Sequence, residues 1–267
     1  MYVLGVVGPE RETRAVADEL ADHFGADGRV ALVERDSTDT DEADGSGADV
    51  TYRLSEQGWT ASGRDRDLPD LLDDLAPEYD YALLANYPDA AVPAVVVGDP
   101  ETDPAGETLL EVEDADALDP AEVATKLAAT EPHETLESLV AQTKRSEDAP
   151  YSGAIATFTG RVRAKEDPDD EPTQFLEFEK YDGVAEERMD AIRAELEERE
   201  GVFEVLLHHR TGVVEYGEDI VFVVVLAGHR EEAFRTVEDG INRLKDEVPL
   251  FKKEVTTDEQ FWVHERS

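Results

Sequence analysis

Cysteine is absent from this sequence of 267 residues, and lysine is scarce, with seven residues in all. Without cysteine the chain cannot form disulfides or thiolate metal sites, and it cannot carry sulfur as a persulfide or a thioester. The six histidines show no helical HxxxH spacing, so we expect no zinc site and no other bound metal. The function must therefore rest on other side chains.

Long apolar segments are also missing. No stretch approaches the length that spans a bilayer, and residues 1–10 have the pattern of a strand. They lack the basic segment that precedes the apolar run of a signal peptide. We therefore expect a cytoplasmic protein.

Positive charge is the third scarce property, because 66 acidic residues face 25 basic ones and the net charge is -41. Such acidity repels nucleic acid and anionic membranes, so we expect neither as a partner. The acidic residues are spread over the whole chain, and 40% of the residues are hydrophobic, which favours folded domains over disorder. The composition is typical of halophilic proteins, whose carboxylates keep the surface solvated in concentrated salt.

The N-terminal half, residues 1–130, alternates predicted strands with predicted helices. This alternation predicts a three-layer α/β domain. A polar, acidic loop is expected at 36–49. The expected strands are 2–7, 31–33, 50–54, 81–87 and 94–97, and the expected helices lie around 16–24 and at 120–129.

The first strand and helix of this half enclose the place where a phosphate-binding loop would lie. Such a loop needs a second glycine, a lysine and a hydroxyl residue, because backbone amides and these side chains hold phosphate and magnesium. Here Gly8 is followed by PERE and then by Thr13, Arg14 and Ala15. The nucleotide-binding pattern is therefore degenerate.

The layout of residues 1–130 resembles the MobB-type GTP-binding adaptor of molybdopterin guanine dinucleotide synthesis. The stretches GVVGP, GADVTYRL and YDYALLANYPDAAVP carry the resemblance. In that family the strand matching 81–87 ends in an acidic residue and glycine, whereas this chain has Ala85 and Asn86. We interpret the domain as a degenerate P-loop domain that is a relic or an interaction module; active GTP binding is the alternative.

One stretch of the C-terminal half, Ile220 to Glu254, contains both a predicted strand–helix unit and most of the candidate site residues. It predicts a buried strand at 220–226 and an amphipathic helix that ends at Pro249. His229 and Arg230 come where the helix begins, and three of the seven lysines follow at and beyond its end. Basic residues number 17 in 131–267 against 8 in 1–130, so we expect an anion site here. Capping of the helix C-terminus is an alternative role for Lys245.

The motifs of residues 135–267 resemble the large, catalytic subunit of molybdopterin synthase, the MoaE family. They are FTGRVR, LEFEKYDGVAEERM, HHRTGVVEYGE, AGHREEAF, LKDEVPLFKKE and FWVHE, in that order. The resemblance implies an α+β domain of the α/β-hammerhead type over 131–267. It also implies that the domain inserts sulfur into cyclic pyranopterin monophosphate to give the dithiolene of molybdopterin.

The resemblance also implies the partner. Sulfur arrives as the C-terminal Gly-Gly thiocarboxylate of a small ubiquitin-like carrier of the MoaD type, so the chain needs no thiol and binds no cofactor of its own. A basic pocket suits these reactants, because the substrate and the thiocarboxylate are both anionic.

The site residues follow from the matching motifs. Lys245, Lys252 and His229 are the expected catalytic residues: Lys245 as proton donor or electrostatic stabiliser, and His229 as proton shuttle. His208, His209 and Arg210 are interpreted as shaping a turn. The expected substrate-binding residues are Arg161, Arg163, His229, Arg230, Lys245, Lys252, Lys253 and Glu254. For Arg161 and Arg163, pairing with the acidic loop 165–172 is an alternative role.

The length of the predicted helix bears on the assembly. Arg230 and Lys245 are fifteen helical residues apart, roughly 22 Å at about 1.5 Å per residue. Either the segment from Lys252 folds back, or the His-Arg pair of a second subunit completes the site. We favour a homodimer within a heterotetramer. Two other functions remain open, a nucleotide-binding adaptor and a non-enzymatic docking platform for ubiquitin-like proteins.

Overall fold

The computed structural model describes residues 1–35, 48–165, 167–181, 183–256 and 260–263. The chain forms two compact units, Met1–Glu134 and Thr135–Ser267. The sequence placed the boundary after residue 130, and the structure divides the chain four residues later. No helix among the described residues is long and apolar enough to cross a membrane.

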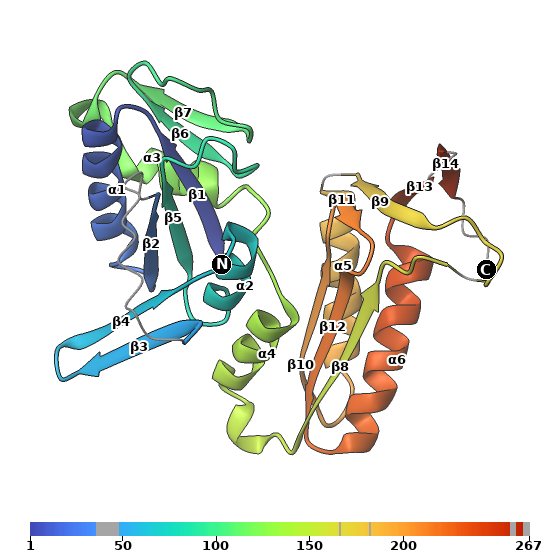
Figure 1. Ribbon diagram of the computed structural model, residues 1–267. Coiled ribbons are helices and arrows are strands. Elements are labelled where there is room, and N and C mark those ends of the chain that lie inside the picture. The colour runs from blue at the N-terminus through green and yellow to red at the C-terminus, as the bar shows by residue number, and fades with distance from the viewer. Residues whose placement is uncertain (36–47, 166, 182, 257–259, 264–267) are drawn as a thin grey trace. The chain divides into compact units, whose positions relative to one another are not determined.

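The N-terminal unit is built on a parallel five-stranded sheet in the order β2-β5-β1-β6-β7 (Figure 1). One face packs against helices α1 and α3, and the other packs against α2, which gives three layers. The central strands are apolar along their whole length because both of their faces are covered. The strands are β1 (Tyr2–Val7), β2 (Val30–Glu34), β5 (Tyr81–Ala85), β6 (Ala94–Val97) and β7 (Thr108–Val112); the helices are α1 (Glu10–Phe24), α2 (Leu68–Leu75), η1 (Ala115–Ala117) and α3 (Pro120–Leu127).

A separate hairpin of β3 (Val50–Ser55) and β4 (Gly58–Gly63) belongs to the same unit. Its two strands pair only with each other among the described residues, and Figure 1 shows them extending away from the five-stranded sheet. The strand expected at 50–54 is therefore present but lies outside the main sheet. Most of the expected acidic loop, residues 36–47, lies outside the described residues.

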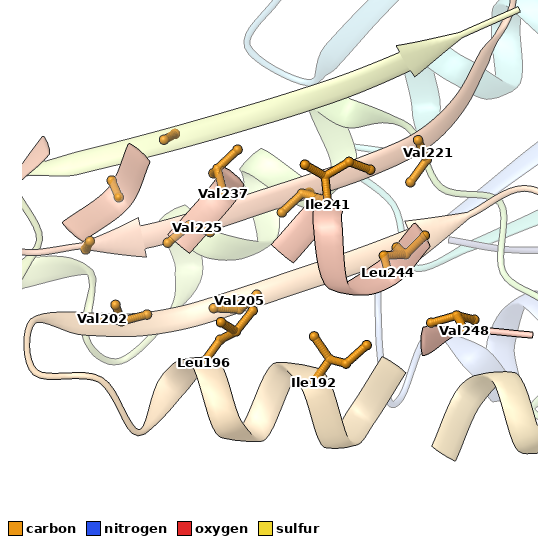
Figure 2. Close-up of a cluster of buried hydrophobic side chains, with 14 of the residues drawn as sticks. Ile192, Leu196, Val202, Val205, Val221, Val225, Val237, Ile241, Leu244 and Val248 are labelled. Carbon is orange, nitrogen blue, oxygen red and sulfur yellow. The ribbon is translucent and has the colours of Figure 1, made fainter. Parts of the chain in front are cut away.

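The C-terminal unit has a three-stranded antiparallel sheet, β10-β12-β8. Alternate residues of the central strand β12 face opposite ways: Val221, Val223 and Val225 pack on helices α5 and α6, and Phe222 and Val224 pack on α4. Figure 2 shows side chains of both helices meeting those of β10 and β12. The elements are β8 (Ala154–Arg161), β10 (Val202–His209), β12 (Asp219–Ala227), α4 (Leu136–Arg145), η2 (Ala149–Tyr151), α5 (Val184–Glu197) and α6 (Arg230–Glu247).

A second antiparallel sheet, β11-β9-β13-β14, completes the unit. It covers a small apolar cluster of its own, formed by Val162, Leu176, Phe178, Val214 and Ile220. The segment that carries Lys252 is therefore a strand within this sheet. Antiparallel sheets combined with helices give the α+β class that was expected. The strands are β9 (Thr173–Lys180), β11 (Gly212–Glu215), β13 (Leu250–Thr256) and β14 (Gln260–Val263).

Candidate active site

His229 and Arg230 lie where β12 passes into α6. Gly228 turns the chain there, with its amide donating to the carbonyl of Gly201 at 2.8 Å. His229 is the N-cap residue, but its side chain makes no capping hydrogen bond, and both side chains are exposed. Neither has an ion pair among the described residues. This pair of cationic or ionisable groups therefore stands at the helix N-terminus, where the helix dipole disfavours positive charge.

Lys245 lies in the last turn of α6 and is exposed. No hydrogen bond or ion pair of its ammonium group occurs within the described part of the chain. The helix ends with the amide of Val248 donating to the carbonyl of Leu244 at 3.2 Å, so Lys245 is not needed as a hydrogen-bonding cap. Its positive charge still interacts favourably with the helix dipole at the C-terminus. Its ammonium group is available to an anionic ligand.

A carboxylate in the same last turn of α6, that of Glu247, is engaged in an ion-pair network. Glu247 accepts hydrogen bonds from Arg243, at 2.7 Å to Nε, and from Arg188. Arg243 also pairs with Glu195 at 2.7 Å. The hydrogen bonds from Arg243 and then from Arg188 hold the pKa of the Glu247 carboxyl below its usual range. The network joins α6 to α5 through Arg188 and Glu195.

Replacing Glu247 with glutamine should lower the free energy of unfolding by roughly 1 kcal/mol at neutral pH, because a network of partly buried ion pairs loses its shared carboxylate. The pKa of Glu247 is lower in the folded protein than in the unfolded chain. The stabilisation is therefore present above the unfolded pKa of about 4.3 and is lost as the pH falls through the folded pKa. Urea unfolding in molar KCl at neutral and acid pH measures it. Glu238→Gln, an exposed position on the same helix, is the control. A difference that persists unchanged at about pH 3 would contradict this account.

The β13 residues divide between the two faces of their sheet. Lys252 is paired in register with Phe178, and Glu254 with Leu176, so both lie on the face that carries the small apolar cluster. Lys253 is paired in register with Glu177 on the opposite face, and its ammonium group lies 3.0 Å from the Glu177 carboxylate. Strand alternation therefore separates the adjacent lysines.

Glu254 has a partner that the sequence did not indicate. The hydroxyl of Thr173, which is buried at the start of β9, donates a hydrogen bond to its carboxylate. This contact joins positions that are 81 residues apart in the chain. Only the pairing of β9 with β13 brings them together, so no local pattern could have revealed it.

Arg161 and Arg163 flank the buried Val162 at the end of β8, and both are exposed. Arg161 pairs with Asp219 at 3.0 Å and donates to the carbonyl of Gly217. Its partner is thus the start of β12 and not the acidic loop 165–172. Val162 belongs to the apolar cluster under the second sheet. The arginine segment and the inner face of β13 therefore border one cluster.

His209 is also part of this region. Its ring packs edge-on against Phe178 at 4.8 Å between ring centres, and Nδ1 lies 2.7 Å from the carbonyl oxygen of Arg210. The side chain is buried, so it supports the strand next to Lys252 and is not positioned to meet a ligand. Lys180, which the sequence reasoning did not select, lies on the same face of β9 as Phe178. It pairs with Glu186 at 2.7 Å, and this hydrogen bond lowers the pKa of Glu186.

The structure thus sorts the predicted site residues into two groups. Lys245, Lys252, Glu254, Arg161 and Arg163 gather around the end of α6 and the second sheet. His229 and Arg230 stand at the start of α6, the other end of an 18-residue helix (Figure 1). At about 1.5 Å per residue the ends of this helix are more than 20 Å apart.

Comparisons with known proteins agree with the motifs of the C-terminal unit. The family model described as MoaE protein matches residues 129–247. The chain is 59% identical over 270 residues to a probable molybdopterin synthase of Haloferax volcanii, covering 100% of both chains. It is 37% identical over 112 residues to the molybdopterin synthase catalytic subunit of Pyrococcus abyssi, covering 42% of this chain and 74% of that one. The X-ray crystal structure of molybdopterin synthase from Staphylococcus aureus aligns with 32% identity and a TM-score of 0.44, covering 51% of this chain and 93% of that one.

Proposed function

This chain belongs to the MoaE protein family of molybdopterin synthase catalytic subunits, and we propose that Lys245 and Lys252 of its C-terminal unit carry out sulfur transfer. The donor is the thiocarboxylate of a small ubiquitin-like carrier. The acceptor is cyclic pyranopterin monophosphate, and the product is molybdopterin. The observation that carries the proposal is the exposed ammonium group of Lys245 seven residues before the partly buried Lys252, beside two exposed arginines.

Each cation has a role that its position supports. Lys245 stabilises the charge that develops when the thiocarboxylate sulfur attacks the pterin, or supplies the proton that balances it. Lys252 and Arg163 bind the phosphate and the pterin, since charge-assisted hydrogen bonds to anions are the strong ones. Glu254, held by Thr173, orients the strand that carries Lys252. Arg161 contributes less directly because Asp219 already engages it.

The distance between the two ends of α6 indicates how the subunits assemble. His229 and Arg230 cannot share one small substrate with Lys245 of the same helix. We propose that they complete the site of a second subunit, with His229 shuttling protons and Arg230 binding the phosphate. The active form is then a homodimer that binds two carrier proteins. The expectations that the chain binds no cofactor of its own and works in the cytoplasm stay predictions.

The N-terminal unit fits a degenerate P-loop domain of the MobB type. Asn86, at a φ of 60°, places its side-chain oxygen 3.3 Å from the hydroxyl of Thr13 and 3.5 Å from the amide of Gly8. Thr13 is 1% exposed. The amide and the hydroxyl that could meet a phosphate are therefore turned toward Asn86. These contacts favour an interaction module over active GTP binding.

Reconstituted sulfur transfer tests the proposal. The purified chain, a thiocarboxylated carrier and cyclic pyranopterin monophosphate are combined in molar KCl, and molybdopterin is measured by the fluorescence of its oxidised product. We expect product from the whole chain and from a chain that lacks residues 1–130. With a verified thiocarboxylate, absence of product would favour the docking-platform function.

Lys252 and Lys253 offer a matched pair of variants in this assay. Lys252→Ala should lower the rate about 10- to 150-fold, which corresponds to the loss of one hydrogen bond to a charged group, about 1.5–3 kcal/mol. Lys253→Ala should leave it within about twofold, because that lysine pairs with Glu177 on the face of the sheet opposite Lys252. Equal losses in both variants would contradict the assignment of faces.

A further inference from the structure

The site residues assigned above bind charge or move protons, since each is a cation, a carboxylate or the imidazole of His229. The proposed substrate also carries a flat heterocyclic ring. Proteins commonly hold such rings by stacking them on an aromatic side chain. We therefore looked for an exposed aromatic ring beside the cations.

Exposed aromatic side chains of the C-terminal unit lie in several different places. Two of them, Tyr181 and Phe251, pack edge-on against each other at 5.3 Å between ring centres, and Phe251 lies on the face of β13 opposite Lys252. Two others belong to η2 and α6, outside the second sheet. The remaining one, Tyr216, is 62% exposed and directly follows β11. Among the described residues of the unit, the set is Tyr151, Tyr181, Tyr216, Phe234 and Phe251.

The turn that carries Tyr216 is bonded to the arginine segment, residues 161–163. The amide of Gly217 donates to the carbonyl of Val162 at 3.0 Å, and the amide of Val162 donates to the carbonyl of Glu218 at 2.9 Å. These bonds continue the antiparallel pairing of β8 with β12. The residue after Val162 therefore lies opposite the residue before Gly217, roughly 5 Å away between Cα atoms. Arg163 and Tyr216 are neighbours.

The pairing of β11 with β9 decides the face on which Tyr216 lies. Beyond the last residues of β11, the amide of Tyr216 donates to the carbonyl of Gln174 at 2.9 Å, so the ladder extends by one residue. Because side chains alternate along a strand, Tyr216 follows Val214 onto the face that carries Lys252 and Glu254. The ring thus belongs to the same side of the sheet as the proposed substrate-binding groups.

The turn itself is firmly held. The amide of Glu215 donates to the Glu218 carboxylate at 2.6 Å, and the amide of Glu218 donates to the carbonyl of Glu215 at 3.1 Å. Gly217 has a φ of 90°, which glycine adopts without strain. An exposed ring on a fixed backbone loses little conformational freedom when a ligand binds.

We infer that Tyr216 is a further substrate-binding residue, whose ring stacks on the pterin while Arg163 and Lys252 hold the phosphate. The inference rests on the proposed function and deepens it. Stacking requires the aromatic ring of Tyr216 and not its hydroxyl group. The contact selects a flat heterocycle over other phosphate esters, which the cations alone would bind equally well.

Binding of cyclic pyranopterin monophosphate to the full chain without a carrier tests the inference, because no sulfur can then be transferred. Dissociation constants are measured by titration calorimetry under argon in molar KCl. Tyr216→Ala should weaken binding about tenfold, the effect of losing one stacked ring. Tyr216→Phe keeps the ring and should bind within about twofold of the wild type. Tyr151→Ala, which removes an exposed tyrosine outside the second sheet, is the control and should bind as the wild type does.

Inorganic phosphate as a competitor separates the ring from the charge. Its inhibition constant should be the same for the wild type and for Tyr216→Ala. Equal weakening of phosphate and substrate binding would overturn the inference, because Tyr216 would then only support the arginine segment. A tenfold loss in Tyr216→Phe would also overturn it, since the hydroxyl group would be the binding group. Thermal midpoints of all variants verify that they are folded.

The outcome for the inference can be told apart from that for the proposed function. Wild-type affinity in Tyr216→Ala would overturn the inference and leave sulfur transfer as proposed. Failure of the wild-type chain both to bind the substrate and to form molybdopterin with a verified thiocarboxylated carrier would overturn the two together.

Discussion

Replacing Lys245 with alanine should reduce sulfur transfer by about 10³-fold, because the group that donates the proton or stabilises the developing charge is lost. The fold should be unaffected, since the side chain is exposed and makes no hydrogen bond or ion pair within the described part of the chain. The measurement is the single-turnover rate of molybdopterin formation with excess thiocarboxylated carrier, together with the thermal midpoint of each protein.

The C-terminal unit offers a matched control for this variant. Lys144 is also exposed and also lies in the last turn of a helix, α4. Lys144→Ala therefore removes the same charge from an equivalent helix position and should retain full activity. Full activity in Lys245→Ala would refute the catalytic assignment. Equal losses in both variants would point to an effect of net charge or helix capping.

Heterodimers that carry one Lys245→Ala chain and one Arg230→Ala chain should recover about half of the wild-type rate. Each homodimer of a single variant has two damaged sites and is nearly inactive. If each site takes Lys245 from one subunit and Arg230 from the other, the mixed dimer has one intact site and one doubly damaged site. The measurement is sulfur transfer by heterodimers purified through two different affinity tags.

The same experiment distinguishes the alternative geometry. If Lys245 and Arg230 of one chain served one site, each site of the mixed dimer would hold one damaged residue, and no activity would return. Re-analysis of tag composition after the assay excludes exchange back to homodimers. A pair of chains that both carry Lys245→Ala, joined through the same tags, sets the background.

Local patterns predicted the elements that position the site. The apolar run predicted a strand at 220–226, and β12 spans Asp219–Ala227; the helix was expected to stop at Pro249, and α6 ends at Glu247. Such elements are readable because periodicity and β-branched runs act within one segment. In contrast, β7 and α2 were missed, since neither has a long enough pattern to stand out.

Contacts between distant segments explain what the sequence could not supply. Alternation shows that Lys252 and Lys253 face opposite ways, but only the pairing of β13 with β9 decides which of them lies over the apolar cluster. The partner of Arg161 proved to be Asp219, 58 positions away, and not the nearer acidic loop. Residue types indicated the chemistry of the site. Long-range strand pairing determines on which face of the sheet each charged side chain lies and which partner it has.

The strand that carries Lys252 rests on a cluster of five buried apolar residues, whereas β12 and α6 share the larger core of the unit. The free energy needed to open a segment locally is lower when the segment has fewer buried apolar contacts to break. The second sheet can therefore open while the main core stays folded, and β13 loses its register before the unit unfolds. We expect heat or denaturant to abolish activity at a lower temperature or concentration than the midpoint of global unfolding. The stability of this small cluster, and not that of the whole protein, then sets the highest temperature at which the protein is active.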